Sequence, residues 1–358
     1  MSEYTRKLEI IRTWMIDHNV GGLYLQSVGS FAWATCGAAS YINTASTNGL
    51  ASLLITQDHQ YLITSNIEAP RLEVEEQLST RGWESVVSAW HESHDAVADL
   101  SRGLRLASDG FYPGATDLSA ELARLRAKLT PEEGSRFRDL GIFCARAMQA
   151  ACESVGPGQT EYEIAARLAA EAEGKGVQAI VNLIASDERI FSFRHPLPTS
   201  KKLDRYAMLI LCGRKDGLIC SLTRLLHFGP LPDELKRKAE ACARVDAAFI
   251  KSTRPADTLG NIFEKAVAMY SAVGYPDEWR KHHQGGTSGY EPREYLAVPD
   301  SLDPVVVGQV YAWNPSITGY KSEDTILVGE SHNEILTEIP GWPEMVMDGI
   351  ARPSILVI

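Results

Sequence analysis

The chain has 358 residues, of which 44% are apolar, and a formal net charge of -11. This length and apolar content are enough for two domains with their own cores. The negative charge argues against nucleic acid and anionic membrane surfaces as main partners, and no apolar run reaches the roughly 18 residues of a membrane span. The first residues lead into an amphipathic segment instead of a signal peptide, so we expect a cytoplasmic protein.

The first 128 residues alternate predicted helices and strands. Leu8, Ile11 and Met15 give residues 4–17 one apolar helical face. Pro70 lies early in a second predicted helix, where proline is tolerated. Strands are expected at 23–25, 50–56, 61–64, 86–87 and 104–107. This alternation predicts a smaller α/β domain over residues 1–128.

The second predicted domain covers residues 129–358. Thr130, Pro131 and Glu133 form an N-cap, a first helical position and a capping-box partner, so a helix should run to about residue 155. Further helices are expected at 161–174, 232–251 and 259–273, and strands at 179–184, 208–212, 218–228 and after residue 275. The predicted order, two helices followed by strands and then two more helices followed by strands, indicates an α+β domain. The six cysteines have no zinc-type spacing and lie mostly in apolar sequence, which predicts buried free thiols.

Residues 281–290 combine two adjacent histidines, three glycines and a tyrosine. Glycine lets a backbone and a ligand approach closely, and histidine titrates near neutral pH. The stretch fits a binding site, but by itself it fits a glycine-rich hairpin with incidental histidines equally well.

The order of motifs resembles that of the creatinase/aminopeptidase family, which has the pita-bread fold. The motifs are Pro131-Glu132-Glu133, the turn at 157–161, Arg194-His195-Pro196, the strand at 217–224, the stretch containing His283, Asn314-Pro315 and Glu323-Asp324-Thr325. The resemblance covers essentially the whole chain. It implies a pita-bread domain over 129–358, preceded by a smaller creatinase-type α/β domain over 1–128.

The departures from the family pattern concern its metals. Metallopeptidases of this family bind two divalent ions through two aspartates, one histidine and two glutamates. The matching positions here are Leu211, Ser221, His283, Asn314 and Glu323. One histidine and one carboxylate cannot offset roughly four positive charges. We therefore expect no dinuclear metal site and no cofactor.

Creatinase is a metal-free member of the family in which a histidine transfers protons, and the matching position here is His195. The resemblance implies a metal-independent hydrolase of a C–N bond in a small molecule, with His195 as general acid/base. His283 and Glu323 complete the predicted catalytic set, with Glu323 as base, nucleophile or substrate clamp. Two structural alternatives stay open: His195 satisfying loop groups near a proline, and Glu323 in a salt bridge to Lys321 or an arginine.

The predicted substrate-binding set comes from the same motifs. A guanidinium suits carboxylates, so we expect an arginine of this set to contact a carboxylate-bearing substrate. Strand alternation would turn His282 away from His283 and favours a structural role for it, and core packing is the alternative for Trp313. The whole set is Arg194, Thr223, Arg224, His282, Tyr290, Arg293 and Trp313.

Two other functions remain open. One is a peptidase of the Xaa-Pro aminopeptidase type, against which the missing ligands argue. The other is a non-catalytic pita-bread binding protein, against which the retained His195, His283 and Glu323 argue. The family also implies a homodimer in which residues 31–33 or 41–43 of the N-terminal domain help to close the partner's active site.

Overall fold

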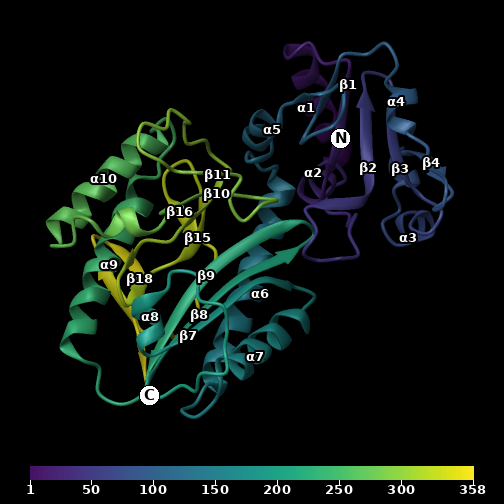
Figure 1. Ribbon diagram of the computed structural model, residues 1–358. Helices are drawn as coiled ribbons and strands as arrows, with labels where there is room; N and C mark the ends of the chain where they lie inside the picture. The colour runs from purple at the N-terminus through teal and green to yellow at the C-terminus, as the bar shows by residue number, and fades with distance from the viewer. The chain divides into compact units, whose positions relative to one another are not determined.

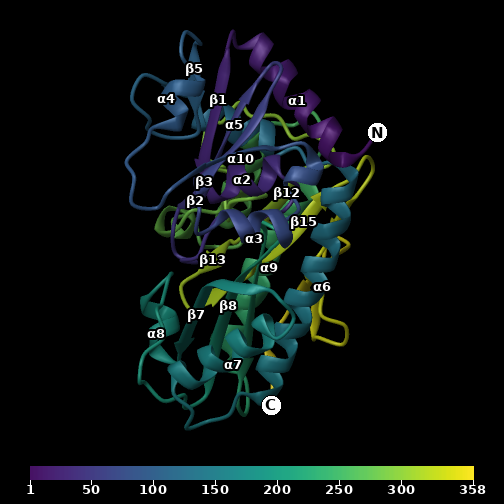
Figure 2. The ribbon, with the colours of Figure 1, turned by 90° about the vertical axis from the view of Figure 1, so that its right-hand side faces the viewer.

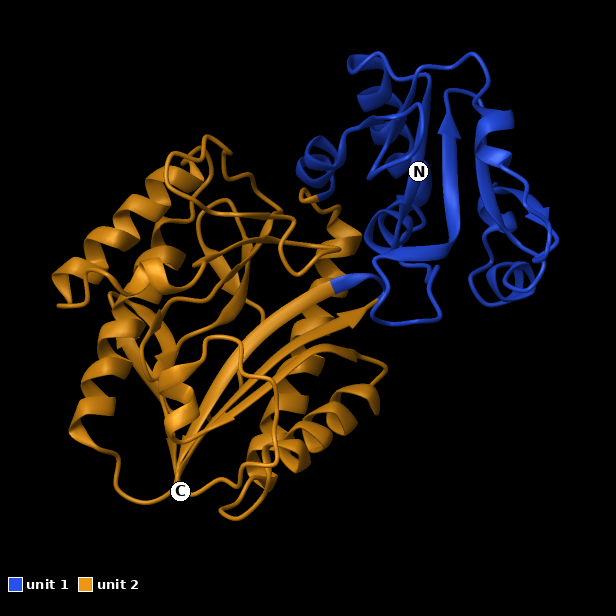
Figure 3. Ribbon diagram, in the orientation of Figure 1, with its two compact units in different colours: residues 1–126, 216–218 blue, residues 127–215, 219–358 orange.

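The computed structural model describes all 358 residues, which pack as two compact units (Figure 3). Unit 1 comprises Met1–Arg126 with Asp216–Leu218, and unit 2 comprises Ala127–Lys215 with Ile219–Ile358. The sequence predicted a division between residues 128 and 129 and did not anticipate that the turn at 216–218 groups with unit 1. No helix combines the length and the apolar character needed to cross a membrane.

Unit 1 is built on a six-stranded mixed sheet with strand order β4-β3-β2-β1-β5-β6. The strands are β1 (Gly22–Ser27), β2 (Asn48–Thr56), β3 (Gln60–Ser65), β4 (Glu84–Ser88), β5 (Leu106–Ser108) and β6 (Thr116–Asp117). The helices are α1 (Glu3–Asp17), α2 (Val28–Ala34), α3 (Ala69–Val74), η1 (Ser79–Arg81), α4 (Ala96–Leu100) and α5 (Ser119–Arg126). The predicted α/β character of this part is thus confirmed.

Helix α2 contains two of the residues that were expected to approach a partner's active site. Phe31 and Trp33 are at most 2% exposed, and every residue of α2 is buried. Their side chains are part of the core of unit 1, which argues against residues 31–33 as the contribution to a partner's site, and the homodimer stays a prediction.

Unit 2 contains two larger sheets, with strand orders β19-β9-β8-β7 and β11-β10-β12-β15-β16, and two small hairpins, β13-β14 and β17-β18. Its helices are α6 (Pro131–Ser154), α7 (Glu161–Glu173), α8 (Glu188–Ser192), α9 (Asp233–Ser252), α10 (Leu259–Ala272) and η2 (Glu278–Lys281). Its strands are β7 (Gln178–Ser186), β8 (Tyr206–Lys215), β9 (Leu218–His227), β10 (Gly285–Ser288), β11 (Tyr295–Leu296), β12 (Val310–Trp313), β13 (Ser316–Ile317), β14 (Tyr320–Lys321), β15 (Asp324–Val328), β16 (Asn333–Ile335), β17 (Glu344–Met347), β18 (Ile350–Pro353) and β19 (Leu356–Val357).

The helices of unit 2 cover its sheets in two pairs (Figures 1 and 2). Helices α6 and α7 pack on each other and on β7 and β8, while α9 packs on α10 and on β12, β13 and β14. The predicted capping box starts α6: Thr130 Oγ1 accepts from the Glu133 N–H at 3.2 Å, and Glu133 Oε2 accepts from the Thr130 N–H at 2.6 Å. The predicted α+β class is confirmed.

Candidate active site

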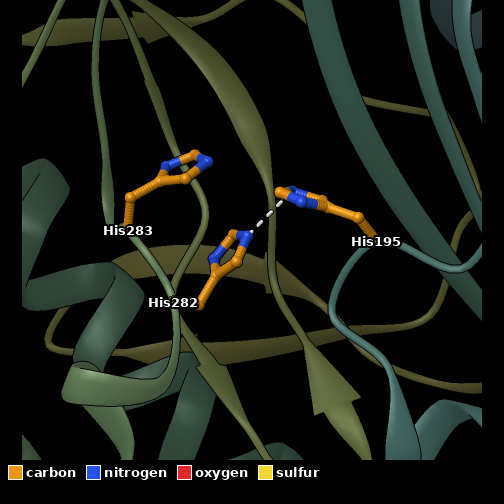
Figure 4. Close-up of side chains that lie close together, drawn as sticks. All are labelled: His195, His282 and His283. Carbon is orange, nitrogen blue, oxygen red and sulfur yellow. Dashed lines mark hydrogen bonds between the residues drawn. The ribbon is translucent and has the colours of Figure 1, made fainter.

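Three histidines from two distant segments meet in unit 2. His195 follows α8, and His282 and His283 lie between η2 and β10. His195 Nε2 and His282 Nε2 are 2.9 Å apart, which requires one ring to donate and the other to accept. Figure 4 shows the rings of His195 and His282 pointing toward one another, with His283 beside them. The ring centroids of His195 and His283 are 5.8 Å apart.

His282 does not turn away from His283. The two rings stack with a centroid distance of 4.3 Å and an interplanar angle of 28°. The alternation rule fails because both residues precede β10, which begins at Gly285, and are not part of a regular strand. The prediction of opposite faces is therefore wrong, and His282 belongs to the cluster.

Glu323 is the carboxylate whose charge acts on the pKa of all three histidines. It is 2% exposed, accepts from Thr223 Oγ1 at 2.7 Å and pairs with Lys321 Nζ at 2.8 Å and Arg293 Nη2 at 3.1 Å. Burial would raise the pKa of Glu323, but the Lys321 and Arg293 cations lower it to about 2. Glu323 therefore forms the salt bridges to Lys321 and an arginine that the sequence left open as the structural alternative. A carboxylate of such low pKa is a weak base.

A buried ionic network holds the backbone of Glu323 from behind. Thr223 N–H donates to Glu323 O at 3.1 Å, which joins β9 to the residue just before β15. The next residue, Asp324, accepts from Arg224 Nη2 at 2.9 Å and from Arg352 Nη2 at 2.6 Å. Arg352 also pairs with Asp246 at 2.7 Å. The side chains of all four members are at most 2% exposed, so the position of Glu323 depends on this network; the members are Arg224, Asp246, Asp324 and Arg352.

The three imidazoles are held in the neutral form. Burial, with the Lys321 cation next in importance, lowers the pKa of His282 to about 2. Burial and then the Arg293 cation lower the pKa of His283 to about 4. The pKa of His195, whose side chain is the most exposed of the three, is also lowered, first by partial desolvation and then by the Lys321 cation. Neutral imidazole offers a lone pair, so at neutral pH the cluster can accept protons or ligate a metal.

These low pKa values predict acid sensitivity. The unfolded chain binds protons at His282 and His283 from about pH 6.5 downward, whereas the folded chain does so only near pH 4 and below. Stability present above pH 6.5 should therefore be lost as the pH falls toward 4. Urea midpoints measured from pH 7 to pH 4 should fall more steeply for the native chain than for a His282→Gln/His283→Gln variant. A His91→Gln variant, which changes an exposed histidine, serves as the control, and equal slopes for all three chains would contradict the prediction.

The residues at the family's metal-ligand positions do not fit two metal ions. Leu211 has no donor atom and is fully buried. Ser221 Oγ donates to Cys212 Sγ at 3.2 Å, and Arg293 Nη1 lies 3.5 Å from the same oxygen. Arg293 thus contacts both Ser221 and Glu323, two of the positions that a dinuclear centre would need for its ligands. A guanidinium there supplies the positive charge that the remaining carboxylate requires.

Several predicted substrate-binding residues lie in structural contacts instead. Arg194 pairs with Glu278 at 2.7 Å. The guanidinium of Arg224 donates to the Asp324 carboxylate and to backbone carbonyls. The Tyr290 hydroxyl donates to Glu133 Oε1 at 2.6 Å. Trp313 stacks on Phe249 in the core at 4.5 Å. These four residues have structural partners, whereas Thr223, His282 and Arg293 belong to the site.

The glycines of the histidine stretch serve the sheet and not ligand access. Gly285 has a φ of +107°, and a Cβ at Gly285 or Gly286 would overlap the backbone of the neighbouring strands β12 and β11. The prediction that these glycines make room for substrate is therefore corrected. They let three strands approach so closely that the segment before them is fixed in place.

Replacing Gly286 with alanine should destabilise the protein by about 1–3 kcal/mol, because the new Cβ overlaps Tyr295 O. Gly134→Ala in α6 is the matched control: its nearest neighbour would be Arg138 Nη1 at 3.8 Å, which is ordinary contact. That control should be neutral or stabilising by about 0.5–1 kcal/mol. Chemical denaturation of both variants checks the difference, and an equal effect would show that the close strand approach is unimportant.

Sequence reasoning placed Lys321 only as a possible partner of Glu323 and missed it as a member of the site. Lys321 and Glu323 are two residues apart, which in extended chain puts them on one face. That spacing was the sequence signal that could have identified Lys321 as a site residue.

A cavity of about 10 Å³, about the space of one water, lies beside Lys321 and His282. A cavity of about 530 Å³ elsewhere in unit 2 is lined by the first turn of α6 and residues 327–334 and contains none of the site residues.

Three curated relatives share parts of this sequence. An uncharacterized peptidase of Staphylococcus epidermidis is 29% identical over 152 residues, 40% of this chain and 43% of the relative. A Xaa-Pro dipeptidase of Pyrococcus horikoshii is 25% identical over 203 residues, 54% and 57% of the two chains. The agropine synthesis cyclase of Rhizobium rhizogenes is 29% identical over 140 residues, 37% and 35%. The chain therefore spans less than two thirds of the length of each.

Solved structures share the fold over nearly the full length. The prolidase from Thermococcus sibiricus superposes with a TM-score of 0.82 at 16% identity and covers 100% of both chains. The N-terminal domain of a FACT complex subunit from chickpea superposes with a TM-score of 0.73 at 12% identity and covers 94% of this chain and 96% of that one. The pita-bread fold with its N-terminal domain is thus confirmed.

A family model described as metallopeptidase family M24 matches residues 135–330, which is more than half of the chain. The match includes His195, His282, His283 and Glu323, together with the substituted ligand positions. This chain belongs to the metallopeptidase family M24.

Proposed function

We propose that this protein hydrolyses a C–N bond in a small, carboxylate-bearing molecule without a metal ion, with His195 as the general acid/base. The observation that carries the proposal is the charge of the site. Two cations, Lys321 and Arg293, face one carboxylate, Glu323, beside three neutral histidines. One positive charge is left in excess, and it favours an anionic substrate.

The donors for that anion are side chains of the site itself. Lys321 has three N–H groups, and its ion pair with Glu323 requires one of them. Arg293 Nε is buried and has no hydrogen-bond partner. A buried donor without a partner costs free energy, which a bound carboxylate would recover. Glu323 then orients the two cations and is not the group that attacks the substrate.

The histidines carry out the proton transfer. A water attacks the carbon of the C–N bond, His195 accepts its proton, and the same proton goes to the leaving nitrogen as the bond breaks. His195 Nε2 donates to His282 Nε2, 2.9 Å away, in the tautomer that this role needs, which leaves the lone pair on His195 Nδ1 to accept the proton. The substrate's negative charge would raise the lowered pKa of His195 toward its ordinary value and strengthen it as a base when substrate is bound.

A panel of N-acyl amino acids, ureido acids and cyclic amidines tests the proposal, with each acid paired with its uncharged carboxamide. Chelator-treated protein should release amine from at least one acid. It should act on the matching carboxamide about tenfold or more slowly, as the loss of a charge-assisted hydrogen bond of about 1.5–3 kcal/mol implies. Equal rates for acid and carboxamide would rule out carboxylate recognition.

A second candidate is hydrolysis of Xaa-Pro dipeptides, which the name of the Pyrococcus horikoshii relative favours. A dipeptide also carries a carboxylate and a C–N bond, so the same panel should include Xaa-Pro dipeptides with and without added Mn²⁺. Turnover confined to Xaa-Pro dipeptides and to Mn²⁺-loaded protein would support this candidate over the first.

A further inference from the structure

The histidine cluster has the geometry of a metal-ligand set that differs from the five-ligand set of the family. The ligand nitrogens of His195, His282 and His283 all lie within 4.8 Å of one another. The closest pair is the Nε2 atoms of His195 and His282 at 2.9 Å. The rings converge from two segments, as Figure 4 shows. Only His283 coincides with a ligand position of the two-metal centre.

The cluster also contains more nitrogen atoms than it has hydrogen bonds. Nδ1 of His282 and Nδ1 of His283 are buried and have no partner. Buried polar atoms in proteins are nearly always satisfied, and an ion is one of the explanations for an exception. Because no hydrogen bond holds a proton on or off these Nδ1 atoms, neither ring is fixed in one tautomer, and each can present a lone pair to a ligand.

We propose that His195, His282 and His283 bind one borderline transition-metal ion, of which Zn²⁺ is the first example, and that this ion inhibits hydrolysis. Three imidazoles with an open fourth position are a common Zn²⁺ arrangement, with Zn–N distances of about 2.0–2.1 Å and hence N–N separations near 3.4 Å. The His195–His282 separation of 2.9 Å is shorter than that value, and all three ligand nitrogens lie within 4.8 Å of one another, so modest ring rotations are enough. Imidazole suits Zn²⁺, Cu²⁺ and Ni²⁺, whereas Mg²⁺ and Ca²⁺ prefer oxygen ligands.

Binding needs no redox step and no net proton release. Each neutral ring gives one lone pair and keeps its proton on the other nitrogen. The proton shared between His195 and His282 moves to Nδ1 of the ring that held it. Because the ion then occupies the one lone pair of His195, it blocks the acceptance of a proton by this ring. The inhibition therefore rests on the proposed function, but the binding does not.

The surrounding charges limit the affinity without abolishing it. Lys321 and Arg293 oppose a dication, but each already pairs with Glu323. An anion such as chloride in the fourth position would reduce the remaining repulsion. The site is thus expected to take one ion, and the same cations disfavour a second.

Titration of Zn²⁺ into untagged, chelator-treated full-length protein tests the binding. Calorimetry should give one equivalent, and Mg²⁺ should give none. His195→Ala and His282→Ala should each weaken Zn²⁺ binding by at least about tenfold, the loss seen when metal sites lose even an outer-shell partner. His91→Ala is the histidine control, and Ser221→Ala tests a ligand position of the two-metal centre. Neither should change the affinity.

His195 is the most exposed of the three, so its alanine variant keeps the test decisive if His282→Ala does not fold. Two equivalents of Zn²⁺, no Zn²⁺ bound at 100-fold excess over protein, or unchanged affinity in His195→Ala would each overturn the proposal. If one equivalent binds with the expected dependence but Zn²⁺ does not slow hydrolysis, the inhibitory half fails alone. If no substrate is found, the calorimetric result still stands, so the two proposals fail separately.

Discussion

Replacing Arg352 with methionine is expected to lower the free energy of unfolding by about 3–5 kcal/mol. Arg352 is 1% exposed and pairs with both Asp246 and Asp324, which are themselves buried. Methionine fills much of the same space, but it leaves the charge of Asp246 without its arginine. The Asp324 carboxylate keeps only Arg224 and the Thr337 hydroxyl as side-chain partners. Urea unfolding followed by circular dichroism measures the loss.

The matched control is Arg244→Met on α9. Arg244 pairs with Glu240 at 2.8 Å, but the two side chains are 48% and 53% exposed. Exposed pairs contribute at most about 1 kcal/mol because water screens them. If Arg352→Met costs no more than Arg244→Met, the buried network does not hold β15 and the Glu323 position in the way described.

Replacing His195 with alanine should lower kcat by about 10²–10⁴-fold on whichever substrate the panel identifies, the range for loss of a general acid/base. The effect on KM should be small, because the proposed function assigns the substrate carboxylate to Lys321 and Arg293 and not to His195. Its exposed position makes a folding defect from this change unexpected, and circular dichroism verifies this. His91→Ala is the control, and full turnover by His195→Ala would show that the acid/base role is wrong.

Most of the fold could be predicted from local signals. The capping box at Thr130 and the apolar patterns of α1, α6, α9 and α10 depend only on short stretches of sequence. The predicted bounds of these helices agree with the observed bounds within a few residues. Helix α2 was missed because all seven of its residues are buried. A buried helix shows no polar face, so its sequence has no helical period to detect.

Part of the membership of the candidate site was predictable from the sequence, but its contacts were not. The motif order identified His195, His283 and Glu323 as positions of interest. Which cation meets Glu323 depends on the pairing of strands that are far apart in the sequence, and local patterns do not encode that pairing. Arg194 and Arg224 carry the same functional group as Arg293, and only their partners, Glu278 and Asp324, set them apart.

The central claim is that side-chain cations have replaced the two metal ions of the family at Glu323. Turnover measured against metal content tests it most directly. Protein is purified without chelator, divided, stripped of metal and reloaded with Mn²⁺, Co²⁺ or Zn²⁺, and each sample is assayed for metal equivalents and rate. We predict full turnover below about 0.1 equivalent, no increase with Mn²⁺ or Co²⁺, and at most one Zn²⁺ bound, as the three-histidine site requires. Turnover that vanishes on stripping and returns as two equivalents bind would contradict the claim.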